Sequence, residues 1–211
     1  MNKITAIRRR GRSRKRVNIF INGSFALALN AETVSKVGFQ IGEELSSDQI
    51  EEAIQTDNFQ SCFNAALHHL SYRPRSENEV RQRLCKSGFS DDLVSKVIIM
   101  LKERGLIDDV AFAQFWKDNR LLFSPRSQWL LRSELKRKGV IDETTEEIVG
   151  DLDDDAGAYE AGKKRSRILA TSSYEEFHRR MSSHLKWRGF SYEVVNRTIK
   201  RLWQEKQSTS I

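Results

Sequence analysis

Three short segments of the same pattern decide the fold: LCKSGF at residues 84–89, LKRKGV at residues 135–140 and LKWRGF at residues 185–190. Their glycines lie about 50 residues apart. An apolar residue stands eight positions before each glycine, and others follow ten and thirteen positions after it. A period of this length is typical of helical repeat proteins. The sequence therefore predicts three copies of one small helical unit.

Each unit is expected to contain three helices. The second helix of the first two copies follows the same phrase, Pro74-Arg75-Ser76 or Pro125-Arg126-Ser127, and these are the two prolines of the chain. Because the residue before proline avoids the α region, a first helix is expected to end there, and a nearby serine then caps the next helix. We expect three structural glycines, Gly88, Gly139 and Gly189, to end the second helices in the left-handed conformation. The third copy lacks this Pro-Arg-Ser phrase.

The N-terminal part predicts β structure. Apolar residues alternate over residues 17–21 and again over residues 25–29, with Asn22-Gly23 between the two runs. Asn-Gly between alternating runs favours a two-residue hairpin turn, since both turn positions need positive φ. A further strand is expected at residues 4–7. A capping box at Ser46–Gln49 predicts a short helix to Ile54, with a polar segment after it.

These features predict a mainly α fold, with three tandem three-helix repeats that form an elongated curved body and a small N-terminal β-hairpin or sheet extension. We assign residues 1–54 to the hairpin, a basic loop and short helices. Residues 61–108, 109–155 and 156–206 are assigned to repeats one, two and three.

Basic residues gather at both ends of this chain of net charge +7. Residues 1–16 hold eight Lys or Arg and no acid, and residues 163–211 hold twelve against four, whereas the middle is acidic. Such ends suit contact with a polyanion or an acidic protein, although solubility alone would also explain them. The candidate residues for contact with nucleic acid or a protein filament are Arg8, Arg9, Arg10, Arg12, Arg14, Lys15, Arg16, Lys163, Lys164, Arg165, Arg167, Arg179, Arg180, Lys186, Arg188, Arg197, Lys200 and Arg201.

Four aromatic residues interleave with the C-terminal basic residues: Tyr174, Trp187, Tyr192 and Trp203. Exposed aromatic side chains could stack on nucleobases. Aromatic residues at helical spacing more often belong to a core, and we expect these four to do so.

The sequence contains no P-loop, G-x-S-x-G or H-E-x-x-H motif. The adjacent His68 and His69 do not share a helix face, and the run Asp151, Asp153, Asp154 and Asp155 is more typical of a solvated linker than of a magnesium site. The two cysteines form no C-x-x-C, no apolar run of about 18 residues exists, and no secretory signal is visible. We predict a cytoplasmic protein with no enzymatic activity, cofactor, metal or membrane contact.

The chain resembles the RecX family of bacterial recombinase regulators. The resemblance rests on the order of several short motifs, and it covers nearly the whole chain. These motifs are Arg16-Val17-Asn18-Ile19-Phe20 with Asn22-Gly23, then Arg73-Pro74-Arg75-Ser76, Gly88-Phe89-Ser90 and Leu106-Ile107-Asp108-Asp109.

The resemblance implies a monomeric, non-enzymatic protein that binds the RecA recombinase, above all its filament on single-stranded DNA. Such a protein would modulate, and mostly inhibit, ATP hydrolysis, coprotease activity and strand exchange in recombination, repair and the SOS response. The alternative is a general DNA-binding module built on helix-turn-helix-like repeats, which would act without a recombinase and contact single-stranded or duplex DNA through the basic segments.

Overall fold

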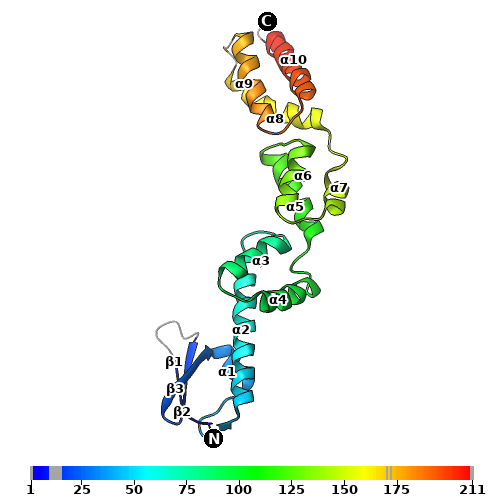
Figure 1. The fold of residues 1–211 in the computed structure, drawn as a ribbon. Helices are drawn as coiled ribbons and strands as arrows, with labels where there is room; N and C mark the ends of the chain where they lie inside the picture. Colours follow the sequence, from blue (N-terminus) through cyan, green and yellow to red (C-terminus); the bar gives the residue numbers. More distant parts are fainter. Residues whose placement is uncertain (1, 10–15, 170, 172, 210–211) are drawn as a thin grey trace. The chain divides into compact units, whose positions relative to one another are not determined.

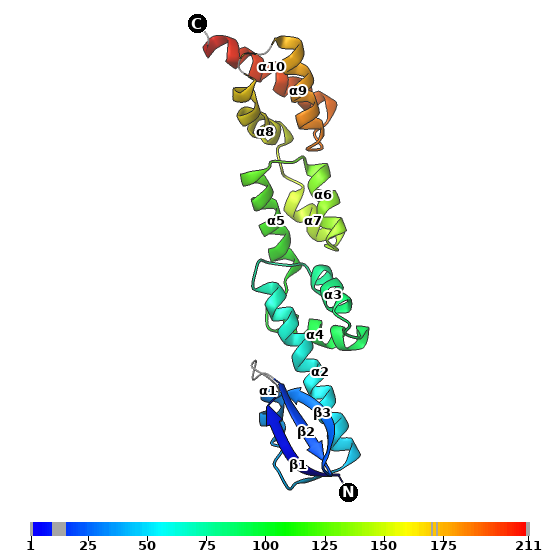
Figure 2. The same ribbon diagram turned by 90° about the vertical axis from the view of Figure 1, so that its left-hand side faces the viewer.

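The computed structural model describes residues 2–9, 16–169, 171 and 173–209. Over these residues the protein is mainly helical, with ten helices and one small N-terminal sheet (Figures 1 and 2). The chain divides into two compact units. The first consists of Met1–Arg73 and Val80–Glu103, and the second of Pro74–Glu79 and Arg104–Ile211.

The sheet of the first unit is antiparallel, with strand order β3-β2-β1-β4. Its strands are β1 (Asn2–Arg9), β2 (Arg16–Ile21), β3 (Ser24–Asn30) and β4 (Glu44–Leu45). The predicted hairpin is confirmed, because Asn22 and Gly23 join β2 to β3 with φ of 51° and 82°. The strand expected at residues 4–7 is also present, within β1.

Helices α1 (Ala31–Val37) and α2 (Ser47–Leu70) pack on this sheet and bury Ile4, Ile19 and Leu29 in a common core. The expectation that the helix after Ser46 ends at Ile54 is wrong. Helix α2 continues for 24 residues, because residues 55–60 contain no helix breaker and the helix buries Ala53, Cys62 and Phe63 on either side of them.

A buried carboxylate also holds the middle of α2 against the sheet. Asp57 Oδ1 accepts hydrogen bonds from the backbone amide of Asn30, at 2.6 Å, and from Thr33 Oγ1, at 2.8 Å. Asn30 is the N-cap residue of α1 and makes no side-chain cap of its own. Asp57, although distant in the sequence, therefore supplies the hydrogen-bond acceptor for a backbone amide and a hydroxyl at the start of α1.

Two shorter helices complete the first unit: α3 (Glu77–Lys86), whose residues Glu77–Glu79 belong to the second unit, and α4 (Asp91–Glu103). Leu84 of α3 and Ile98 and Leu101 of α4 are buried, as their fixed distances from Gly88 predict.

The second unit contains two helix triplets. They are α5 (Asp109–Phe123), α6 (Gln128–Arg137) and α7 (Asp142–Val149), followed by α8 (Asp154–Ile168), α9 (Tyr174–Lys186) and α10 (Tyr192–Thr209). Each triplet has its own buried core, the first around Phe112 and Leu135, the second around Phe177, Met181 and Leu185. The domain boundaries assigned from the sequence stay a prediction.

The three structural glycines adopt the same conformation. Gly88, Gly139 and Gly189 have φ of 91°, 82° and 83°. After each glycine, the amide of the next residue donates back to the carbonyl of the repeated leucine, with distances of 3.1 to 3.4 Å. This is the Schellman arrangement that glycine favours after a helix. Helices α3, α6 and α9 thus end in equivalent turns, which we call the glycine turns, and the repeat predicted from sequence is present.

Candidate binding surfaces

The Pro-Arg-Ser phrase of residues 74–76 holds the glycine turn at the end of α6. Ser76 Oγ donates to the carbonyl of Lys138 at 2.6 Å and accepts from the amide of Glu79 at 3.2 Å. The approach is close, because a Cβ placed on Gly139 would lie 2.5 Å from Asn78 Cβ.

We call this contact between a Pro-Arg-Ser phrase and a glycine turn a joint. A second joint lies between residues 125–127 and the glycine turn at the end of α9. The Ser127 amide donates to the carbonyl of Arg188 at 3.0 Å, and Ser127 Oγ accepts from the Leu130 amide at 3.2 Å. A Cβ on Gly189 would lie 2.6 Å from Ser127 Oγ and 2.7 Å from Leu130 Cβ. Each Pro-Arg-Ser phrase therefore packs against the glycine turn of the following copy and hydrogen-bonds to it. The third copy lacks the phrase.

A buried glutamate forms a polar cluster in the second unit that sequence reasoning missed. Glu134 is 6% exposed and accepts from Trp116 Nε1 at 2.7 Å and from Arg120 Nε at 2.9 Å. Arg126 Nη1, from the Pro-Arg-Ser phrase, lies 2.5 Å from its other oxygen. These cations offset the cost of burying the carboxylate.

The described candidate residues of the N-terminal extension, Arg8, Arg9 and Arg16, lie at one end of the β1–β2 pair. Arg8 and Arg9 face Asn18 and Val17 across the ladder, and the Arg8 guanidinium lies 5.2 Å from the Phe20 ring centre. Arg16 Nη2 donates to the carbonyl of Ala28 and lies 3.6 Å from Asp57 Oδ2, although the side chain remains 48% exposed. The other four candidates, Arg10, Arg12, Arg14 and Lys15, lie outside the described residues.

Most C-terminal candidates are exposed on α8, α9 and α10 or at their ends. These exposed residues are Lys163, Lys164, Arg167, Arg179, Arg180, Lys186, Arg197, Lys200 and Arg201. Several of them already have acidic partners. Arg197 makes two hydrogen bonds to Asp155, at 2.9 and 2.6 Å, which lower the pKa of that carboxyl below its usual range.

The three candidate cations of α10, Arg197, Lys200 and Arg201, are therefore partly neutralised. Arg201 Nε lies 3.1 Å from Glu205 Oε1, so two of the three are paired and Lys200 is exposed beside them. Arg180 and Lys163 are also paired, with Glu176 at 2.7 Å and Glu160 at 3.9 Å. The role of these residues in contact with a partner stays a prediction.

Three aromatic residues contradict the expectation that all four lie in a core, the first of them Tyr174, which is 49% exposed. Trp187 is 86% exposed and Tyr192 is 68% exposed. Lys186 Nζ lies 5.8 Å from the Tyr192 ring centre. Trp203 does pack against the core of the last triplet, and Tyr174 meets its ring edge-to-face at 5.2 Å. The expectation rested on helical spacing, whereas Trp187 follows the last residue of α9 and is the C-cap residue of that helix.

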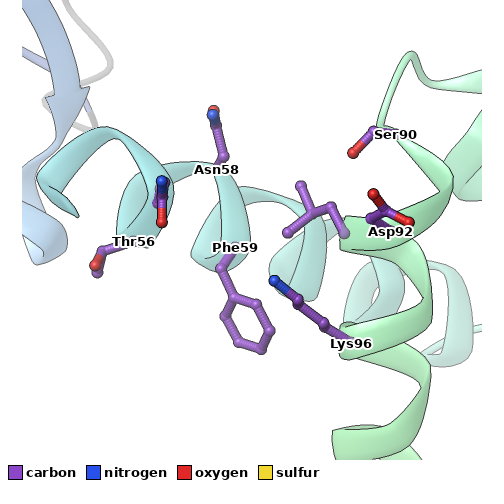
Figure 3. A pocket seen from close by; sticks show the side chains of 8 residues that line it. Thr56, Asn58, Phe59, Ser90, Asp92 and Lys96 are labelled. Carbon is purple, nitrogen blue, oxygen red and sulfur yellow. The ribbon is translucent and has the colours of Figure 1, made fainter. Parts of the chain in front are cut away.

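A cavity of about 510 Å³ lies between α2 and α4 in the first unit. Figure 3 shows Thr56, Asn58 and Phe59 on α2, opposite Asp92 and Lys96 on α4. The lining carries one acid and one base and no cysteine or histidine. Among the described residues, no group of three or more His, Cys, Asp or Glu side chains is placed to hold a metal ion. Within the same residues, no helix has the length and apolar character needed to cross a bilayer.

The fold and its surfaces define a helical repeat protein with an N-terminal sheet. Two family models match: "Regulatory protein RecX N-terminal domain" over residues 2–46 and "RecX, first three-helix domain" over residues 62–99. A regulatory protein RecX of Bacillus velezensis is 30% identical over 201 residues, which cover 94% of this chain and 76% of that one. Another from Clostridium perfringens is 28% identical over 207 residues, covering 96% and 97%.

Two solved structures have a similar fold. One, a crystal structure of regulatory protein RecX, has a TM-score of 0.65 at 21% identity and covers 94% of this chain and 98% of its own. RecX from Lactobacillus salivarius has a TM-score of 0.58 at 25% identity over 70% of this chain and 97% of its own. The chain belongs to the RecX family of regulatory proteins.

Proposed function

We propose that this protein binds the RecA recombinase and its nucleoprotein filament, and that it modulates and mostly inhibits ATPase, coprotease and strand-exchange activities during DNA recombination and repair. The observation that carries this proposal is family membership along almost the whole chain, which spans sheet and repeats alike. The protein would act in the cytoplasm as a monomer, by binding rather than by catalysis.

The exposed cations give this proposal a physical basis. Lys164, Arg167, Arg179 and Lys200 are exposed, and no ion pair to a described acidic residue is found for them. They are suited to an acidic protein surface or to DNA phosphates, both of which a nucleoprotein filament presents. Arg8 and Arg9 offer a second, separate cationic surface on the N-terminal sheet.

The test is the DNA-dependent ATPase activity of RecA, measured as the protein is titrated from substoichiometric to equimolar amounts. The proposal expects the rate to fall, and it expects the protein to co-sediment with RecA filaments on single-stranded DNA. A matched variant, in which Lys164, Arg167, Arg179 and Lys200 are changed to Ser, should need a higher concentration for the same effect. No change in ATPase rate at any ratio, together with no co-sedimentation, would overturn the proposal.

A second candidate function is DNA binding without a recombinase. The exposed Trp187 and Tyr192 beside Lys186 favour it, because aromatic faces next to cations suit stacking on single-stranded bases. Under this function the protein alone binds an oligonucleotide, with log affinity falling against log salt at a slope of about −0.7 per single-strand phosphate contact. Trp187→Ala should then weaken oligonucleotide binding, whereas under the first function it should leave filament binding nearly intact.

A further inference from the structure

A second cavity, of about 390 Å³, lies inside the second unit. The end of α5 and residue Pro125 form one side of it, while α8 and the C-terminal part of α9 form the other. Neither cysteines nor hydroxyl side chains line it. Most of its lining consists of cationic side chains and large apolar side chains, and Glu160 is its one acidic residue.

Three cations line this cavity: Lys164, Arg165 and Arg188. Arg165 and Arg188 are half-buried, and the Nε atom of each is buried without a hydrogen-bond acceptor. Arg188 Nη1 reaches only the His184 ring nitrogen and carbonyl, at 3.2 and 3.3 Å. Among the described residues, neither guanidinium nor Lys164 forms an ion pair. The one acidic lining residue, Glu160, lies 3.9 Å from Lys163, which is outside the lining.

The pKa values of two groups that line the cavity are lowered. Burial, and then the nearby Arg188 and Arg165, lower the pKa of His184. Burial and the nearby Arg126 lower the pKa of Arg188. Half-buried guanidinium groups that are not paired with a carboxylate are costly, and a bound anion would reduce that cost.

The mouth of the cavity is apolar. Leu122, Phe123 and Ile168 are 71%, 70% and 71% exposed, and all three line the cavity. Single exposed apolar residues are ordinary, but three large ones around one concave site are typical of a binding surface. Two of the three are aliphatic and offer no flat face for a nucleobase, so the lining favours peptide side chains over nucleotides.

We propose that this cavity binds a peptide segment of a partner protein in which carboxylates flank a large apolar side chain. The carboxylates would pair with Arg165, Arg188 and Lys164, and the apolar side chain would pack on Leu122, Phe123 and Ile168. This site goes beyond the proposed recombinase role and does not require it.

The test measures binding of a fluorescent, blocked hexapeptide in which Asp and Glu flank Leu and Phe, by anisotropy with the full-length protein. A second peptide, with Asn and Gln in place of the acids, tests the need for charge. Arg165→Gln removes a cavity cation, and Arg137→Gln removes an exposed cation outside the cavity as its control. Phe123→Ser and Ile141→Ser form the matched apolar pair, since Ile141 is 64% exposed and does not line the cavity.

The expected result is binding of the acidic peptide only, weakened about tenfold by Arg165→Gln and by Phe123→Ser and unchanged by both controls. Absence of binding to the unaltered protein, or binding that the cavity variants leave unchanged, would overturn the proposal. Displacement of the peptide by a short oligothymidine at equal concentration would also overturn it, in favour of nucleic acid. If the peptide fails while the protein still co-sediments with RecA filaments, the cavity proposal falls and the proposed function stands. If the peptide binds but the protein does not co-sediment with RecA filaments, the cavity proposal stands and the proposed function falls.

Discussion

Alanine in place of Gly189 should destabilise the second unit more than alanine in place of Gly105. Both glycines have positive φ, of 83° and 64°, so both substitutions incur a left-handed penalty of about 1–2 kcal/mol. A Cβ at residue 105 meets no described atom within 4 Å, whereas one at residue 189 would lie 2.7 Å from Leu130 Cβ. Leu130 Cβ is fixed to the backbone of α6 and cannot move aside alone. Overpacking of this kind adds about 1–3 kcal/mol, so the Gly189→Ala variant should lose about 2–5 kcal/mol in total.

Tryptophan fluorescence during urea unfolding measures this difference directly. All four tryptophans of the chain, Trp116, Trp129, Trp187 and Trp203, lie in the second unit, so their signal reports on that unit and not on the first. Gly105→Ala is the matched control, because it changes the backbone preference in the same unit without a collision. Equal losses of unfolding free energy in the two variants would refute the joint between Ser127 and Gly189.

Three further predictions concern buried polar groups. Asp57→Ala should lower the unfolding free energy of the first unit by about 2–4 kcal/mol, because the Asn30 amide and the Thr33 hydroxyl lose their acceptor. Urea melts followed by circular dichroism measure this loss. The control is Asp48→Ala at an exposed position, and equal losses in the two variants would contradict the prediction. Glu134→Gln should lower the unfolding free energy of the second unit by about 3–5 kcal/mol, measured by tryptophan fluorescence, since two guanidinium groups lose a buried carboxylate. Glu146→Gln changes an exposed pair and should lower it by less than about 1 kcal/mol. Similar losses in the two variants would argue against the buried cluster. The pKa of His184 is lowered from 6.5 in the folded protein, so its contribution to stability is complete above pH 6.5 and is lost as the pH falls through the folded-state pKa. His184→Gln should therefore reduce the fall of the urea midpoint on the acid side. An unchanged fall would show that other groups cause it.

The repeated local signals predicted much of the fold. The glycine turns follow from a backbone conformation that glycine adopts readily, and the apolar positions around them are buried as their spacing requires. The Asn22-Gly23 hairpin follows equally from local turn preference. Such features depend on neighbours in the sequence, so a single sequence carries enough information to place them.

Features that depend on distant partners were not predictable in this way. The burial of Asp57 in the middle of α2 rests on Asn30 and Thr33, and the burial of Glu134 rests on Arg126 and Trp116. Likewise, the pattern of charges predicted basic surfaces, but it could not show that Arg197 is paired with Asp155. The cationic cavity brings α5, α8 and α9 together, and no motif in the sequence links these three helices.

The joint between copies also limits how this protein can grow in length. Only the middle copy, among the described residues, carries both parts of the joint: its own Pro-Arg-Ser phrase receives Gly189, and its Gly139 is received by the phrase before it. Duplicating that copy in a gene would produce a longer protein with every joint filled. Appending a copy after α10 would leave the new copy nothing to dock on. Internal duplication of the middle copy is therefore the lengthening that this joint allows.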